Sequence, residues 1–195
     1  SPKVKYGNTK DPEKRAKMDE AARGEQISKM ALSPLWGKVC SVAIVREDGT
    51  DDVLCATEEE DILKLIFAEF SLKNNGAPQP VTWNGAEFDL PFIWKRAMIL
   101  GMNMISMCAS RLSIFTRRYQ TEPHCDLMQT WCGWRGYEKL DTVAKVVLDE
   151  SKQEIDVTTF PELMQTKEGR KQIANYNFID AALTWKLYEK FNLYL

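Results

Sequence analysis

The segment from Asn84 to Ala97 places a carboxylate where α/β proteins commonly carry out chemistry. Its sequence, NGAEFDLPFIWKRA, follows a predicted short strand over 80–83 and opens a predicted helix. Asp89 therefore stands at the carboxyl end of a strand, where open α/β sheets place their sites. The structural alternative is that Asp89 caps the helix, with Pro91 in the first turn.

A second group able to do chemistry lies on the last predicted helix. Tyr176 and Asp180 are four residues apart, so the phenol and the carboxylate share one helix face with Ile173, Leu183 and Leu187. A carboxylate within an apolar stripe costs free energy unless it has a partner, and a metal ion is one such partner. The alternative is a partly buried Asp180 that accepts a hydrogen bond.

Alternating helices and short strands must hold these residues in place. Hydrophobic periodicity and turn signals predict helices over 12–30, from 57, over 90–100, over 140–148 and over 167–191, with strands over 39–45, 52–55, 80–83 and near 126–127. The 39–45 stretch is almost continuously apolar, which predicts a strand buried on both faces. This order indicates one mixed α/β domain over 1–195, with 1–34 as a helical arm ahead of the strands.

Together, the two chemical segments resemble the second and third motifs of the DEDD-superfamily exonucleases. The pattern is NGxxFDxPxxxxRA followed by YxxxD about ninety residues later. It is most similar to the 3′→5′ exonucleases related to the exonuclease domain of B-family DNA polymerases, and the likeness extends from Asp11 to Phe191. The resemblance implies an RNase H-like α/β fold, with a mixed central sheet flanked by helices.

The same resemblance implies a metal-dependent nuclease. Its substrate would be a single-stranded DNA 3′ end, with RNA as the alternative, and it would release nucleoside monophosphates. Four carboxylates in this superfamily hold two divalent cations, and oxygen ligands favour Mg²⁺ or Mn²⁺. Asp89 and Asp180 match two of the four as catalytic metal ligands, and Tyr176 matches the residue that orients the attacking water. Another branch has histidine where this chain has Asn175.

Three residues of the first segment are expected to contact the substrate: Asn84, Phe88 and Arg96. Arg96 and its neighbour Lys95 lie one to two turns beyond Asp89, within reach of a DNA phosphate. For Arg96 the alternative is equally open, namely that it anchors the helix by packing and ion pairing.

The chain departs from the superfamily at the first motif, Asp-x-Glu on an apolar strand. The acid pairs nearest this pattern lie in a charged helix (19–20), in a turn (47–48) and at the opening of a strand (51–52), and none lies within an apolar strand. Two carboxylates and the first central strand are therefore unaccounted for, and a gap is expected between 39–45 and 80–83. The simplest explanation is a chain that starts after that strand; the alternative is that Lys3–Tyr6 pairs there without carboxylates. A catalytically silent module that binds nucleic acid or a protein partner is the alternative function.

Other polar clusters favour structural roles. His124, Cys125, Asp126 and Cys132 match no zinc-ligand spacing, so we expect a hydrogen-bonded His124 and a structural Asp126. Trp83 is expected in the core rather than under a base. The arginines at 111, 117 and 118 indicate a solvated basic patch or, alternatively, a surface that guides a nucleic-acid strand.

Composition narrows the class of protein. A net charge of −2 argues against a protein that binds nucleic acid through a strongly basic surface. A metal-dependent nuclease does not need such a surface. Five cysteines without a C-x-x-C pair indicate reduced thiols and a cytoplasmic protein. No apolar run has membrane-spanning length and no signal peptide opens the chain, so no membrane partner is expected. The sequence does not indicate an oligomeric state.

Overall fold

The computed structural model describes residues 4–70, 79–103, 115–116, 122–152 and 154–194. The stretches 71–78, 104–114 and 117–121, and with them the arginines at 111, 117 and 118, lie outside the described residues. The elements in chain order are α1 (Pro12–Ala31), β1 (Ser41–Ile44), β2 (Asp52–Cys55), α2 (Glu59–Glu69), β3 (Val81–Thr82), α3 (Asp89–Ile99), β4 (Cys125–Asp126), α5 (Leu127–Cys132), α6 (Leu140–Leu148), the 3₁₀ turn η2 (Val157–Thr159), α7 (Phe160–Leu163) and α8 (Lys167–Phe191). The mixed α/β class is confirmed.

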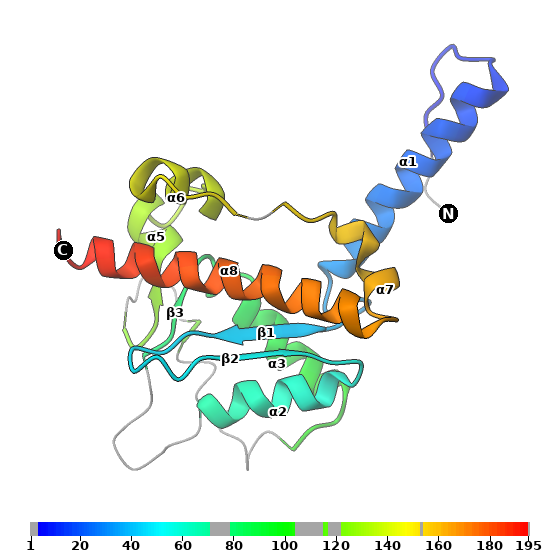
Figure 1. The fold of residues 1–195 in the computed structure, drawn as a ribbon. Coiled ribbons are helices and arrows are strands. Elements are labelled where there is room, and N and C mark those ends of the chain that lie inside the picture. Colours follow the sequence, from blue (N-terminus) through cyan, green and yellow to red (C-terminus); the bar gives the residue numbers. More distant parts are fainter. Residues whose placement is uncertain (1–3, 71–78, 104–114, 117–121, 153, 195) are drawn as a thin grey trace.

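Helix α8 runs across the molecule and joins most other elements (Figure 1). It contacts β1, β2 and β3 as well as α5, α6 and α7. Thr166 caps its first turn by accepting a hydrogen bond from the Gly169 N–H at 2.9 Å. Its carboxyl half shares one apolar core with α5 and α6, formed by Leu127, Leu140, Val143, Ala144, Leu183, Leu187 and Phe191. This packing fixes the helix that carries Tyr176 and Asp180.

A second core lies between α2 and α3. Its buried residues include Ile62, Leu63, Phe67, Leu90 and Ala97. Beside this core lies a buried ion pair between the two helices, in which the guanidinium of Arg96 donates to both carboxylate oxygens of Glu59, at 2.9 and 2.6 Å.

Strands β1 and β2 form an antiparallel hairpin in the register Ser41↔Cys55 to Ile44↔Asp52. Gly49, with φ 75°, provides the left-handed position in the connecting turn. The prediction that the first strand is buried on both faces is wrong, because all four residues of β1 are only half-buried. The reason is that β1 borders a large cavity.

Strands β3 and β4 form a separate parallel pair, in the register Val81↔Cys125 and Thr82↔Asp126. Within the described residues the two pairs are not joined into one sheet. Between them lies a cavity of about 2050 Å³, which is lined by all of β1 and by residues 79–84 around β3. Among the described residues the two pairs therefore do not form the single mixed sheet that the sequence suggested.

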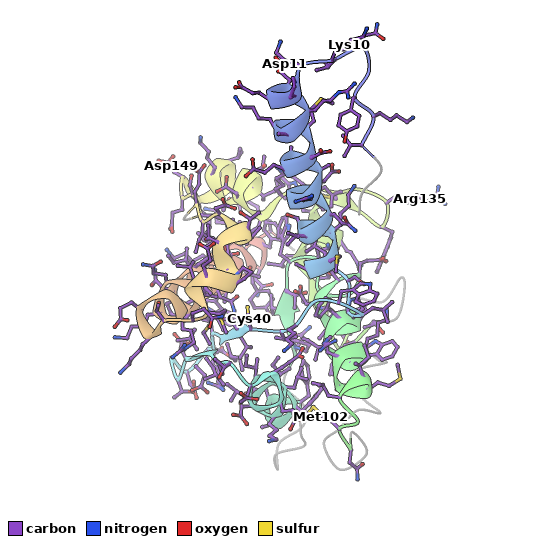
Figure 2. All side chains as sticks on the ribbon, turned by 90° about the vertical axis from the view of Figure 1, so that its right-hand side faces the viewer. Lys10, Asp11, Cys40, Met102, Arg135 and Asp149 are labelled. Atoms are coloured by element: carbon purple, nitrogen blue, oxygen red, sulfur yellow. The ribbon has the colours of Figure 1, made fainter. Side chains whose placement is uncertain are left out.

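Helix α1 is an arm that projects from the body (Figure 1). It has no buried residue, and Asp11 caps it by accepting hydrogen bonds from the N–H groups of Glu13 and Lys14. Figure 2 shows Lys10 and Asp11 at the far tip of the arm. Tyr6 donates its hydroxyl to Asp19 on the arm at 2.7 Å, so residues 4–6 do not pair between the strands. The alternative that Lys3–Tyr6 pairs between the strands is therefore wrong for residues 4–6. Lys3 itself lies outside the described residues.

Candidate functional site

The turn that carries Asp89 is held by a buried carboxylate from the neighbouring strand. Asn84 has φ 64°, a left-handed conformation that turns the chain directly after β3. Asp126 at the end of β4 is 4% exposed, and its two oxygens accept the N–H groups of Asn84 (2.9 Å) and Ala86 (3.0 Å). The structural role expected for Asp126 is therefore confirmed, and that role is to shape the candidate site.

Thr82 links this turn to the single histidine of the chain. Its hydroxyl accepts the Gly85 N–H at 3.1 Å and lies 2.8 Å from Nε2 of His124. A Cβ on Gly85 would lie 2.3 Å from the Thr82 hydroxyl oxygen, so the turn requires glycine. His124 is buried, and its Nδ1 donates to the carbonyl of Phe115 at 2.7 Å. Burial lowers the pKa of His124, which is a satisfied structural residue as predicted rather than a zinc ligand.

Asp89 opens α3 without capping it. The N-cap position is Phe88, and Asp89 is the first residue of the helix, so the structural alternative of an N-cap aspartate does not hold. Its side chain is exposed to the cavity, although protein surrounds it on other sides. Desolvation by this surrounding protein, and secondarily the charge of Asp126, raise the pKa of Asp89 to about 6. Water that enters the cavity opposes this shift by solvating the charged form.

Asp180 and Tyr176 lie beside a lysine that no sequence pattern indicated. Lys152 Nζ lies 2.6 Å from Oδ2 of Asp180 and 5.1 Å from the centre of the Tyr176 ring. The second oxygen, Oδ1, is buried and has no hydrogen-bond partner among the described residues. Burial raises the pKa of Asp180, although hydrogen bonding and charge from Lys152, and the Tyr176 hydroxyl, oppose that shift. Burial would lower the pKa of Lys152, but the interactions with Asp180 and Tyr176 outweigh it and raise that pKa.

The lysine is placed by the loop that follows α6. The backbone N–H of Lys152 donates to Oδ1 of Asp141 at 2.7 Å, which ties this loop to the first turn of α6. Phe160 of α7 also packs edge-on against Tyr176, with the ring centres 6.3 Å apart. No sequence spacing links Lys152 to Asp180, because the partner comes from an irregular loop.

The three expected substrate contacts have different surroundings. Asn84 and Phe88 line the cavity, and Phe88 is 37% exposed with one side against Phe92 at 5.9 Å. Arg96 is 6% exposed and does not line the cavity. Its third hydrogen bond goes to the carbonyl of Pro34 at 2.8 Å, in addition to the two with Glu59. Arg96 is therefore the helix anchor, and the structure corrects its expected contact with DNA phosphate.

Trp83 also has a structural role, as expected. It packs against the core shared by α5, α6 and α8, and its indole N–H donates to the carbonyl of Glu138 at 3.0 Å. The cysteines at 40, 55, 125 and 132 are free thiols, and the fifth, at 108, lies outside the described residues. No helix in the described part of the chain has the length and apolar character needed to cross a membrane.

Asp89, Tyr176 and Asp180 all line the cavity between the two strand pairs. Carboxylate oxygens are suitable ligands for Mg²⁺ or Mn²⁺, and the buried Oδ1 of Asp180 has no hydrogen-bond partner among the described residues. However, no group of three histidine, cysteine, aspartate or glutamate side chains in the described ranges is placed to hold a metal ion. The residues present therefore fit part of a divalent-cation site.

Residues 32–195 match a protein family described as "Predicted 3'-5' exonuclease related to the exonuclease domain of PolB". The match begins after α1, so the arm lies outside it. The chain is also similar to the catalytic subunit of DNA polymerase epsilon from Dictyostelium discoideum, with 30% identity over 138 residues. That alignment covers 67% of this chain but 6% of the relative.

Proposed function

The chain belongs to the family of predicted 3′-5′ exonucleases related to the exonuclease domain of PolB, and from this premise we propose that it hydrolyses single-stranded DNA from the 3′ end with the help of divalent cations. The observation that carries the proposal is that Asp89, Tyr176 and Asp180 line the same cavity. The products would be nucleoside monophosphates.

In this proposal, Asp89 and Asp180 hold the cation through their carboxylate oxygens. A bound Mg²⁺ or Mn²⁺ supplies a Lewis acid for the phosphate and lowers the pKa of a water molecule. The Tyr176 hydroxyl, one helical turn before Asp180, orients the water that attacks the phosphate. Lys152 must release Oδ2 of Asp180 for both oxygens to serve the cation, since its ammonium lies 2.6 Å away.

The two further carboxylates of the superfamily pattern would come from an extended segment that occupies the cavity. At about 2050 Å³ the cavity exceeds the roughly 300–1,000 Å³ of small-molecule pockets. It also borders backbone that lacks a strand partner in the described chain. With its amide oxygen turned toward β1, Asn177 of α8 accepts from the N–H groups of Val42 (3.3 Å) and Ala43 (3.2 Å), so a side chain rather than a strand meets this backbone. Such a segment with Asp-x-Glu would complete both the sheet and the cation site.

The test adds an apolar segment with Asp-x-Glu ahead of residue 1 through a flexible linker; this is the complemented chain. With Mg²⁺ and a 5′-labelled single-stranded oligonucleotide, it should produce a ladder of products shortened from the 3′ end. Asp89→Asn and Asp180→Asn should each abolish the ladder, while Asp61→Asn, at an exposed position in the first turn of α2, should not. A complemented chain that leaves the oligonucleotide intact, or Asp89→Asn and Asp180→Asn variants that digest it at the unchanged rate, would contradict the proposal.

The ion pair between Lys152 and Asp180 favours a second candidate, a catalytically silent nucleic-acid-binding module. In that case the ammonium occupies the position of the cation permanently. Calorimetric titration with Mn²⁺ separates the two candidates. The silent module predicts no binding by the complemented chain, with or without Lys152→Met, whereas the nuclease predicts binding that Lys152→Met makes tighter.

A further inference from the structure

The loop between α5 and α6 displays an aromatic and basic surface that the proposed chemistry does not use. Gly133 ends α5 with φ 72°, and Gly136 N–H closes the turn onto the Gly133 carbonyl at 3.3 Å. A Cβ on Gly136 would lie 2.4 Å from the carbonyl oxygen of Cys132. These two glycines give the loop a defined shape, with residues 134 and 135 at its tip.

Four side chains on this loop face solvent, and we call them the aromatic rim: Trp134, Arg135, Tyr137 and Lys139. Trp134 is 41% exposed, Tyr137 is 69% exposed, and the two basic side chains are also exposed. Figure 2 shows Arg135 projecting away from the body of the protein. Exposed aromatic side chains with exposed cations beside them are the combination that single-strand nucleic-acid surfaces use.

The aromatic rim is attached to the candidate site. The Trp83 indole donates to the Glu138 carbonyl, which ties the loop to the end of β3, directly before the turn that leads to Asp89. Tyr137 and Lys139 line the same cavity as Asp89 and Asp180. A polymer with one end at the carboxylates can therefore continue along the cavity wall onto the rim.

We propose that the aromatic rim binds the single-stranded DNA that leads into the candidate site, with bases stacked on Trp134 and Tyr137 and phosphates paired with Arg135 and Lys139. This inference rests on the proposed nuclease function and adds where the strand lies beyond its 3′ end. Single-strand binding surfaces combine aromatic side chains, which stack any base, with cations that follow the backbone. Duplex DNA keeps its bases stacked internally, so the rim distinguishes single strands from duplexes.

The test measures DNA binding without catalysis, on the chain of residues 1–195 in EDTA. Fluorescence anisotropy with labelled (dT)₁₅ gives the Kd, and the matched duplex is the comparison. Trp134→Ala and Tyr137→Ala should each raise the Kd about fivefold or more, since one stacked base contributes at least about that factor. Arg135→Ala should reduce the slope of log K against log salt by about 0.7, the value for one single-strand phosphate contact.

Two control variants make the same kinds of substitution at positions outside the aromatic rim. Trp36→Ala removes a 70% exposed tryptophan that does not line the cavity, and Arg23→Ala removes an exposed arginine on α1. Both should bind (dT)₁₅ like the unchanged chain. The thermal unfolding midpoint of each variant shows whether a loss of binding is accompanied by a loss of folded structure.

Binding that weakens in the rim variants and not in the controls supports the proposal. A chain that does not bind (dT)₁₅, or rim variants within twofold of the unchanged chain, would overturn it. Ladder formation by the complemented chain is a separate measurement, so digestion that survives the loss of the rim would reject this inference and retain the nuclease. Binding that depends on the aromatic rim, without digestion by the complemented chain, would reject the nuclease function and keep the rim as a binding surface for single-stranded DNA.

Discussion

Removing one partner of the buried ion pair between Arg96 and Glu59 should destabilise the protein strongly, because the pair joins α2, α3 and the segment ahead of β1. Arg96 makes three hydrogen bonds, two to Glu59 and one to the Pro34 carbonyl. Glu59 also accepts the Val39 N–H at 2.8 Å. Replacing Arg96 with methionine leaves the Glu59 carboxylate buried without its cation.

Breaking a buried ion pair by removing one partner costs about 3–5 kcal/mol. With a urea dependence of about 2 kcal/mol per molar, Arg96→Met should lower the urea midpoint by roughly 1.5–2.5 M. The double variant Arg96→Met, Glu59→Leu removes both charges. It should lose only about 1–3 kcal/mol, the cost of leaving the Val39 N–H without an acceptor, rather than the sum of the single losses.

Urea unfolding followed by circular dichroism measures these differences. Lys95→Met is the matched control, because the neighbouring Lys95 lies on the Trp94 ring at 5.5 Å and contributes about 0.5–1 kcal/mol. If Arg96→Met shifts the midpoint no more than Lys95→Met, the anchoring role is wrong. Weaker binding of (dT)₁₅ with unchanged stability would restore Arg96 as a substrate contact.

Three further predictions concern the cavity. Tyr176→Phe in the complemented chain should lower turnover about a hundredfold or more while leaving the urea midpoint almost unchanged, since only the hydroxyl is lost; equal rates in a digestion assay would remove Tyr176 from the mechanism. The pKa of Asp89 is raised to about 6, so between about pH 4 and 6 its carboxyl is protonated in the folded state and ionised in the unfolded state. The free energy of unfolding therefore falls as the pH rises through this window. Asp89→Asn should therefore raise the urea midpoint at pH 7 and leave it unchanged below pH 4, and equal effects at both pH values would show that the pKa is not raised. Residues 1–195 without the added segment should bind Mn²⁺ weakly or not at all in calorimetry, because two carboxylates supply too few ligands for two hard cations, and tight binding would show that other carboxylates of this chain contribute.

Much of the fold follows from local patterns. The last helix extends over Lys167–Phe191, as its apolar stripe and boundaries predicted, and Asp11 caps the arm helix as expected. By contrast, helix α5 (Leu127–Cys132) was not predicted. It is short and held by tertiary packing of Leu127 against α6 and α8, which leaves little periodic signal in the sequence.

The candidate site depends on both levels. Spacing along the chain alone placed Tyr176 one turn before Asp180, because the α-helix has a constant period. The tertiary structure assigned the partners: Glu59 for Arg96, Asp126 for the turn at Asn84, and Lys152 for Asp180. These pairs join segments that are distant in sequence, and a side chain of long reach has many possible partners until the backbone is folded. The sequence by itself thus determined which residues can do chemistry, while packing decided which of them face the cavity and which are held inside as anchors.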